Sequence, residues 1–250
     1  YGVTKSEDAK AKAKRTFEAL ERLETVTGIP GYPARSYVRS EDLLAPSRSP
    51  HPKNWHPSPD GEWQWLDDTS SDEIVGHLFS MALYHDMVAD EADKKKVVDL
   101  IDRIVSHIVD NDLQLIDYDG KPTRWAIWTP DSLNRSSNWY YEKGLNSLQI
   151  LSSLQTAYHF TGKAKYKKVY RHLIEKEGYA QNALQAKMTD PFDISHSDDI
   201  LNFFPYYNCF CQCFIKGGQG FKHRFARNSN FPLGHDYLVY RQQPSLGLKG

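Results

Sequence analysis

Apolar positions along the chain follow two different helical patterns. Between residues 94 and 108, apolar side chains recur every three or four positions, as at Val97 and Ile101, with charged side chains between them. This spacing gathers the apolar side chains on one stripe, so it predicts an amphipathic helix whose lysine-rich side is solvated. Residues 74–83 and residues 145–154 are instead apolar around most of the helix axis, which predicts helices that are buried on most sides.

These patterns repeat in pairs. Tyr1, Tyr84 and Tyr158 each stand before a short polar break, a lysine-rich turn and an amphipathic helix, and a buried helix precedes the second and third copies. An apolar inner helix followed by an amphipathic outer helix is the pattern of an α/α toroid or a helical solenoid. We therefore predict an all-α fold of helical hairpins, and we expect the chain to start inside a hairpin. His77 and His85, on or just after the first inner helix, are interpreted as core residues.

The connections within the hairpins are only a few residues long, whereas those from each outer helix to the next inner helix are long: residues 28–69, 112–140 and 178–196. Connections in compact domains are usually about 4–6 residues, and longer ones often carry function. In a stack of antiparallel hairpins, all the long connections emerge at one end, beside the N-termini of the inner helices. We therefore expect one face to collect them. Within the second connection, Asp119-Gly120 between two apolar runs predicts a short β-hairpin.

Aromatic residues are concentrated in the first two long connections, which hold all six tryptophans: Trp55, Trp63, Trp65, Trp125, Trp128 and Trp139. Tyr140 and Tyr141 add to this group. Aromatic faces stack on the C–H faces of sugar rings, and their polar atoms can bond to sugar hydroxyls. The alternative is that the tryptophans form a small core for the long connections themselves.

Acidic residues gather at the starts of the inner helices. Ser70 and Glu73 form a capping-box signature. The candidate catalytic acids are Asp67, Asp68, Asp72, Asp198 and Asp199, and the tryptophans are joined as candidate substrate-binding residues by Arg124, Tyr140, Glu142 and His196. Paired carboxylates suit glycosidic-bond hydrolysis, in which one protonates the leaving oxygen and the other activates water or attacks. The alternatives are proton abstraction by His196 with Tyr140 and Arg124, as in a lyase, and calcium ligation by the acids.

Composition narrows the classes of partner. The chain has 250 residues, of which 40% are hydrophobic and 25% charged, and its formal net charge is −1. This balance gives no reason to expect nucleic acid or a membrane surface as partner, and no apolar run approaches the roughly 20 residues that span a bilayer. Cys209, Cys211 and Cys213 are odd in number and closely spaced, which argues against a disulfide framework. No metal or other cofactor is predicted, and no oligomeric state is assigned.

Three segments resemble bacterial proteins of the six-hairpin, (α/α)6-toroid type: Gly28–Ser36, Asp68–His77 and Gly144–Leu148. The resemblance covers roughly residues 1–208, and proteins of this type are grouped by fold with glycoside hydrolases and polysaccharide lyases. It implies a toroid whose active cleft lies at the N-termini of the inner helices. Because about three hairpins are visible where a closed toroid needs six, we expect a partial toroid over residues 1–208. Residues 209–250 lack a helical period and are expected to form an irregular tail.

The preferred hypothesis is a carbohydrate-active protein, a glycoside hydrolase that acts on a poly- or oligosaccharide. The alternatives are a non-catalytic glycan-binding or sensory module, a polysaccharide lyase, and a helical repeat that binds protein. Side chains of Asp67, Asp68 and Asp198 within roughly 10 Å across an open groove would favour hydrolysis. Diverging acids beside exposed tryptophans would favour binding, and buried tryptophans a structural role. The sequence does not assign a compartment, although a periplasmic or secreted location is favoured.

Overall fold

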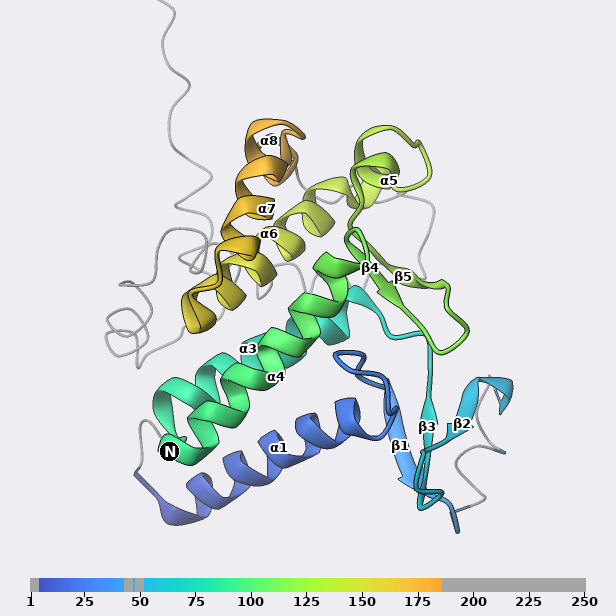
Figure 1. Ribbon diagram of the computed structural model, residues 1–250, viewed down its shortest axis with the longest axis vertical. Helices are drawn as coiled ribbons and strands as arrows, with labels where there is room; N and C mark the ends of the chain where they lie inside the picture. The colour runs from blue at the N-terminus through green and yellow to red at the C-terminus, as the bar shows by residue number, and fades with distance from the viewer. Residues whose placement is uncertain (1–4, 43–46, 48–51, 186–250) are drawn as a thin grey trace, which may run out of the picture. The chain divides into compact units, whose positions relative to one another are not determined.

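The computed structural model describes residues 5–42, residue 47 and residues 52–185, which belong to one structural unit (Figure 1). Most of these residues are helical, and two small antiparallel sheets lie in the long connections. The predicted site residues His196, Asp198 and Asp199, the cysteines and the predicted boundary at residue 208 lie outside the described residues.

The first helix pair consists of α3 (Ser71–Met87) and α4 (Glu91–Asp110). The predicted capping box begins α3: Glu73 N donates to Ser70 Oγ, and Ser70 N donates to Glu73 Oε2 at 2.6 Å. The apolar stripe of α4 is buried, while its charged side faces outward. His77 on α3 is buried as predicted. The two helices run side by side in Figure 1 and confirm the predicted hairpin.

The second pair consists of α6 (Lys143–Thr161) and α7 (Ala164–Glu175), with Gly162 in a left-handed conformation closing α6. Residues 146–154 of α6 are buried on all sides, because α3, α4, α7 and the short α8 (Tyr179–Asn182) all pack against this helix. The amphipathic α1 (Glu7–Thr25) packs on α3. There Phe17 of α1 stacks on Tyr84, with ring centroids 4.9 Å apart.

The first long connection contains a sheet that the helical prediction did not include. Strands β1 (Ser36–Arg39), β2 (Trp55–Pro57) and β3 (Trp63–Leu66) pair antiparallel in the order β1-β3-β2. The short 3-10 helix η1 (Pro52–Asn54) precedes β2. Because side chains alternate along a strand, Trp65 shares one face with its cross-strand partners Tyr37 and His56. This sheet accounts for much of the aromatic content of the connection.

The second long connection contains the predicted β-hairpin, formed by β4 (Gln114–Ile116) and β5 (Pro122–Ile127). Gly120, in the turn, has a φ of +76°, and its N–H donates to the carbonyl of Asp117. The hairpin leads to α5 (Pro130–Asn134) and to the 3-10 helix η2 (Tyr140–Glu142), which precedes α6. The hairpin prediction is therefore confirmed.

The long connections meet one another at one end of the helices. His107 on α4 contacts the first connection, where its Nδ1 lies 3.0 Å from the Pro30 carbonyl, and the second, where Ile116 N donates to its Nε2. Tyr179, in the third connection, donates its hydroxyl to the Trp128 carbonyl at 2.6 Å. The predicted gathering of connections is confirmed for their described parts. Among the described helices, none is both long and apolar enough to cross a bilayer.

Candidate functional site

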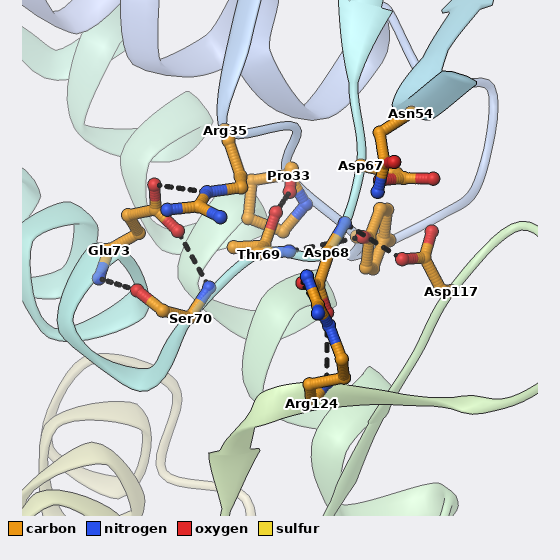
Figure 2. A network of polar contacts seen from close by, with 11 residues as sticks. Pro33, Arg35, Asn54, Asp67, Asp68, Thr69, Ser70, Glu73, Asp117 and Arg124 are labelled. Atoms are coloured by element: carbon orange, nitrogen blue, oxygen red, sulfur yellow. Dashed lines mark hydrogen bonds and ion pairs between the residues drawn. The ribbon is translucent and has the colours of Figure 1, made fainter. Parts of the chain in front are cut away.

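Asp67 directly follows β3 and is buried against the three-stranded sheet. Its carboxylate accepts a hydrogen bond from Asn54 Nδ2 at 2.6 Å, and His56 Nε2 lies 2.7 Å from its other oxygen. An ionised carboxylate only accepts hydrogen bonds, so Nε2 of His56 carries the proton. The Asp67 side chain is 7% exposed. Both of its oxygens therefore hold the end of β3 to the segment around β2, as the placement of Asn54 in Figure 2 illustrates.

Asp68 faces the other connection. Its carboxylate accepts from the backbone N–H of Arg124 at 2.9 Å and from Nε and Nη2 of the same residue at 2.9 and 2.7 Å. Its own N–H donates to Asp117 Oδ2 at 2.9 Å, and its φ is +60°. The side chain is 10% exposed. Asp68 thereby fastens the β4–β5 hairpin to the start of α3, as seen in the centre of Figure 2.

Asp117 is a carboxylate that the sequence analysis did not select. Besides the Asp68 N–H, it accepts from the Tyr118 N–H at 2.7 Å. Burial raises the pKa of the Asp117 carboxyl, and the nearby negative charge of Asp67 adds to this effect. Burial also raises the pKa of the Tyr32 phenol. Asp68 and Asp117 therefore link the two connections through hydrogen bonds, whereas the bonds of Asp67 stay within the first connection.

Asp72 differs from the other two predicted acids that the structure describes, because it is exposed. It lies in the first turn of α3, where the helix dipole favours negative charge. Its Oδ1 accepts from Gln149 Nε2 at 3.2 Å, and Gln149 Oε1 lies 3.3 Å from Trp128 Nε1. Gln149 on α6 thus joins the exposed acid on α3 to the residue that follows β5.

The tryptophans divide into two groups. Trp128 is fully buried, and Trp65 is 2% exposed, so the prediction that these two rings are available to a substrate is wrong. Both fill space beneath the connections, as the alternative interpretation required. Trp55 is partly buried on β2, and Trp63 lies beneath the guanidinium of Arg39, 4.1 Å from its ring centroid.

The second group forms an exposed cluster that we call the aromatic surface, consisting of Trp125, Trp139, Tyr140 and Tyr141. Trp125 is 49% exposed, Tyr140 51% and Tyr141 43%, and Trp139 is partly exposed. The rings of Trp125 and Trp139 meet edge to face with centroids 6.4 Å apart, and Tyr141 stacks on Trp139 at 6.2 Å with an interplanar angle of 23°. Trp125, Trp139 and Tyr140 had been predicted as substrate-binding residues, and Tyr141 had been noted as a member of the same aromatic group.

Arg124 and Glu142 flank the aromatic surface. The guanidinium of Arg124 lies 5.8 Å from the Trp125 ring centroid, and its side chain is 62% exposed although Asp68 binds one edge of it. Glu142 ends η2 directly before α6. The structure therefore brings together the predicted residues of the second connection, whereas Asp67 points away into the first.

Sequence reasoning missed three residues that organise this region: His56, Asp117 and Gln149. His56 follows Trp55 on a three-residue strand, which is too short to reveal its orientation. Asp117 precedes the Asp119-Gly120 turn, and that position was a usable signal because turn-flanking aspartates often accept backbone N–H groups. Gln149 is a polar residue within the buried helix α6, and buried polar groups require partners.

These observations define a mostly helical protein in which successive helices pack in pairs, with aromatic and charged side chains on the connections at one end. Comparison of the chain with protein-family models, curated proteins and solved structures gives no match.

Proposed function

We propose that the protein binds carbohydrate on the aromatic surface, at the rim of a partial (α/α) toroid. The observation that carries this proposal is the exposed, mutually contacting group of Trp125, Trp139 and Tyr141. Large aromatic side chains normally bury much of their surface, and exposed apolar patches mark interaction sites. The buried Trp65 and Trp128 already supply the connections with a core.

The arrangement of these rings suits a sugar chain better than a flat aromatic ligand. Trp139 and Tyr141 are nearly parallel with centroids 6.2 Å apart, while Trp125 stands at 87° to Trp139. An edge-to-face pair forms a corner, in which a pyranose ring can stack on one indole while its edge contacts the other. Indole N–H and phenol O–H groups can in general also bond to sugar hydroxyls.

The partial toroid is supported by the two helix pairs. Helices α3 and α6 pack against each other and carry the buried, weakly charged pattern of inner helices, while α4 and α7 are amphipathic. The aromatic surface lies on the connection that leads into α6. This is where the resemblance to the six-hairpin proteins places the active cleft.

Hydrolysis of a glycosidic bond is the second candidate function, and the exposure of Asp72 favours it. An exposed carboxylate at the N-terminus of an inner helix can act as an acid or a base towards a bound sugar. Hydrolysis needs a second carboxylate beside Asp72. Asp67 and Asp68 are poorly suited to be that carboxylate, because buried hydrogen bonds already occupy their oxygens. The partner acid in this proposal is Asp198 or Asp199, outside the described residues.

The binding proposal is tested by titrating the protein with a panel of neutral, amino and acidic oligosaccharides, followed by calorimetry and indole fluorescence. One lost aromatic contact is worth about 1 kcal/mol, so Trp125→Ala and Trp139→Ala should each weaken binding roughly fivefold to tenfold. Tyr118→Ala is the matched control, because Tyr118 is 53% exposed but lies outside the aromatic surface. A panel without any ligand, or equal losses in all three variants, contradicts the proposal.

The hydrolytic candidate is tested with the same ligands by measuring the release of reducing ends. Asp72→Asn should abolish turnover while leaving binding intact, because the amide preserves the shape of the side chain and removes its ability to transfer a proton. Turnover that persists in Asp72→Asn assigns the chemistry elsewhere, and absence of turnover in the unmodified protein leaves binding as the function.

A further inference from the structure

We infer that Asp68 is the positioning residue of the aromatic surface, holding the β4–β5 hairpin so that Trp125 meets Trp139; this inference rests on the proposed function. The assignment differs from the sequence-based prediction, in which Asp68 was a catalytic acid. Four hydrogen bonds carry it, three to Arg124 and one to Asp117.

The contacts of Asp68 reach both arms of the hairpin. Asp117 directly follows β4, and Arg124 lies within β5. The Asp68 N–H binds the first arm, while its carboxylate binds the backbone and the guanidinium of the second. A two-stranded hairpin is marginally stable by itself, so this attachment decides where the hairpin lies relative to α3.

The backbone at Asp68 adapts to this task. Its φ of +60° lies in the left-handed region, which a residue with a side chain adopts only at a cost. Aspartate tolerates this conformation better than most residues, and such strain persists where the surrounding structure holds it. The surrounding contacts here are the same bonds to Asp117 and Arg124.

The direction of Trp125 follows from the hold on Arg124. Successive side chains of a strand point to opposite faces. The hydrogen bonds that hold the Arg124 side chain on one face of the hairpin therefore also place the Trp125 ring on the other face. The ring of Trp125 then meets Trp139, which belongs to the segment before α6. Loss of the Asp68 carboxylate should let β5 shift and separate the two indoles.

A catalytic role fits Asp68 poorly. Both of its oxygens accept hydrogen bonds from Arg124, and 10% of its side chain is exposed. Arg124 thus occupies three of the roughly four acceptor sites of this carboxylate.

The test compares Asp68→Asn with Asp67→Asn. Both remove one buried carboxylate, but the partners of Asp67 are Asn54 and His56 on the sheet side, while those of Asp68 are on the hairpin. Asp68→Asn should weaken binding of the best panel oligosaccharide about tenfold and reduce the near-ultraviolet circular dichroism that arises from the Trp125–Trp139 pair. Asp67→Asn should lower the melting temperature and leave affinity and that signal unchanged. Equal loss of affinity in both variants, or unchanged affinity in Asp68→Asn, overturns the inference.

Two further variants keep the test decisive. Arg124→Gln removes the same contact from its more exposed partner, so it should reproduce the same spectral change. In the double variant, the loss of affinity should be no larger than in either single variant, because both remove one shared contact. If Trp125→Ala leaves binding unchanged, the proposed function fails. The near-ultraviolet signal then still decides whether Asp68 positions the indoles.

Discussion

Substitution of Gly31 by alanine tests how the first connection is held against helix α4. Gly31 has a φ of +78°, and its N–H donates to Glu24 Oε1 at 2.8 Å. A Cβ atom at this position would lie 2.2 Å from the carbonyl oxygen of Arg103, within α4. Helix backbone cannot yield as a flexible side chain does, so the connection itself has to move away.

Two costs add up in Gly31→Ala. The left-handed backbone costs an alanine about 1 kcal/mol relative to glycine, and the overlap with Arg103 adds about 1–3 kcal/mol. In a unit of this size, each kcal/mol lowers the melting temperature by about 2–4 °C. We therefore expect Gly31→Ala to lower it by about 5–15 °C.

Gly61→Ala is the matched control, because Gly61 has a φ of +74° but no atom lies within 4 Å of the position of its Cβ. It should lose only the backbone contribution, or about 2–4 °C. Thermal unfolding followed by far-ultraviolet circular dichroism measures both variants. Equal shifts would refute the steric part of the reasoning and mean that the connection does not press on α4.

Three further predictions concern buried charges. Glu24 is 4% exposed and is bound by Arg103 Nε at 2.8 Å. Arg103→Met should therefore lower the free energy of unfolding in urea by about 3 kcal/mol, because it leaves a buried carboxylate without its partner. Glu24→Gln should lower it less, because Arg103 retains Asp99 as a partner. Burial lowers the pKa of His77 from 6.5 to about 4, so between these pH values the unfolded chain binds one more proton than the folded chain. The free energy of unfolding should therefore fall as pH drops from 6.5 to about 4. His77→Gln should reduce this dependence on pH, and an unchanged dependence would show that His77 is not its source. The raised pKa of the Asp117 carboxyl makes stability depend on pH in the opposite direction. Its contribution to the free energy of unfolding is present below pH 3.8 and is lost as pH rises through the folded-state pKa. The free energy of unfolding of Asp117→Asn should lack that decline with rising pH, and a decline equal to that of the unmodified protein would exclude Asp117 as its source.

Helix periodicity was sufficient to predict the helix pairs. Two signals extend over about three turns or more: the apolar stripe through Val97 and Ile101, and the apolar run of residues 145–154. A pattern of this length rarely arises by chance, so it predicts a helix reliably. The cap at Ser70 and the turn at Gly120 depend on one or two residues whose backbone requirements are narrow. Each of these predictions is confirmed.

The sheet and the roles of the acids were harder to predict, because they depend on distant partners. Strands of three or four residues are too short to show alternation, although Trp63 and Trp65 hint at it. The position of Asp68 beside a helix N-terminus was evident, but its partner Arg124 lies 56 residues away. Whether hydrogen bonds already occupy a carboxylate depends on the tertiary structure. This information changed the interpretation of Asp67 and Asp68 from catalytic acids to structural residues.

Two hydrogen bonds imply an order of folding during synthesis. They run from the Tyr179 hydroxyl to the Trp128 carbonyl and from Asn182 Nδ2 to Asn134 Oδ1. A ribosome delivers the N-terminal part first, and domains fold as their segments emerge. Helices α1, α3 and α4 can therefore pack early, whereas the segment that carries Trp139 gains these two hydrogen bonds only after residue 182 has left the exit tunnel. A nascent chain arrested before that point would display its indoles without the support that arranges them, and chaperones would meet them first.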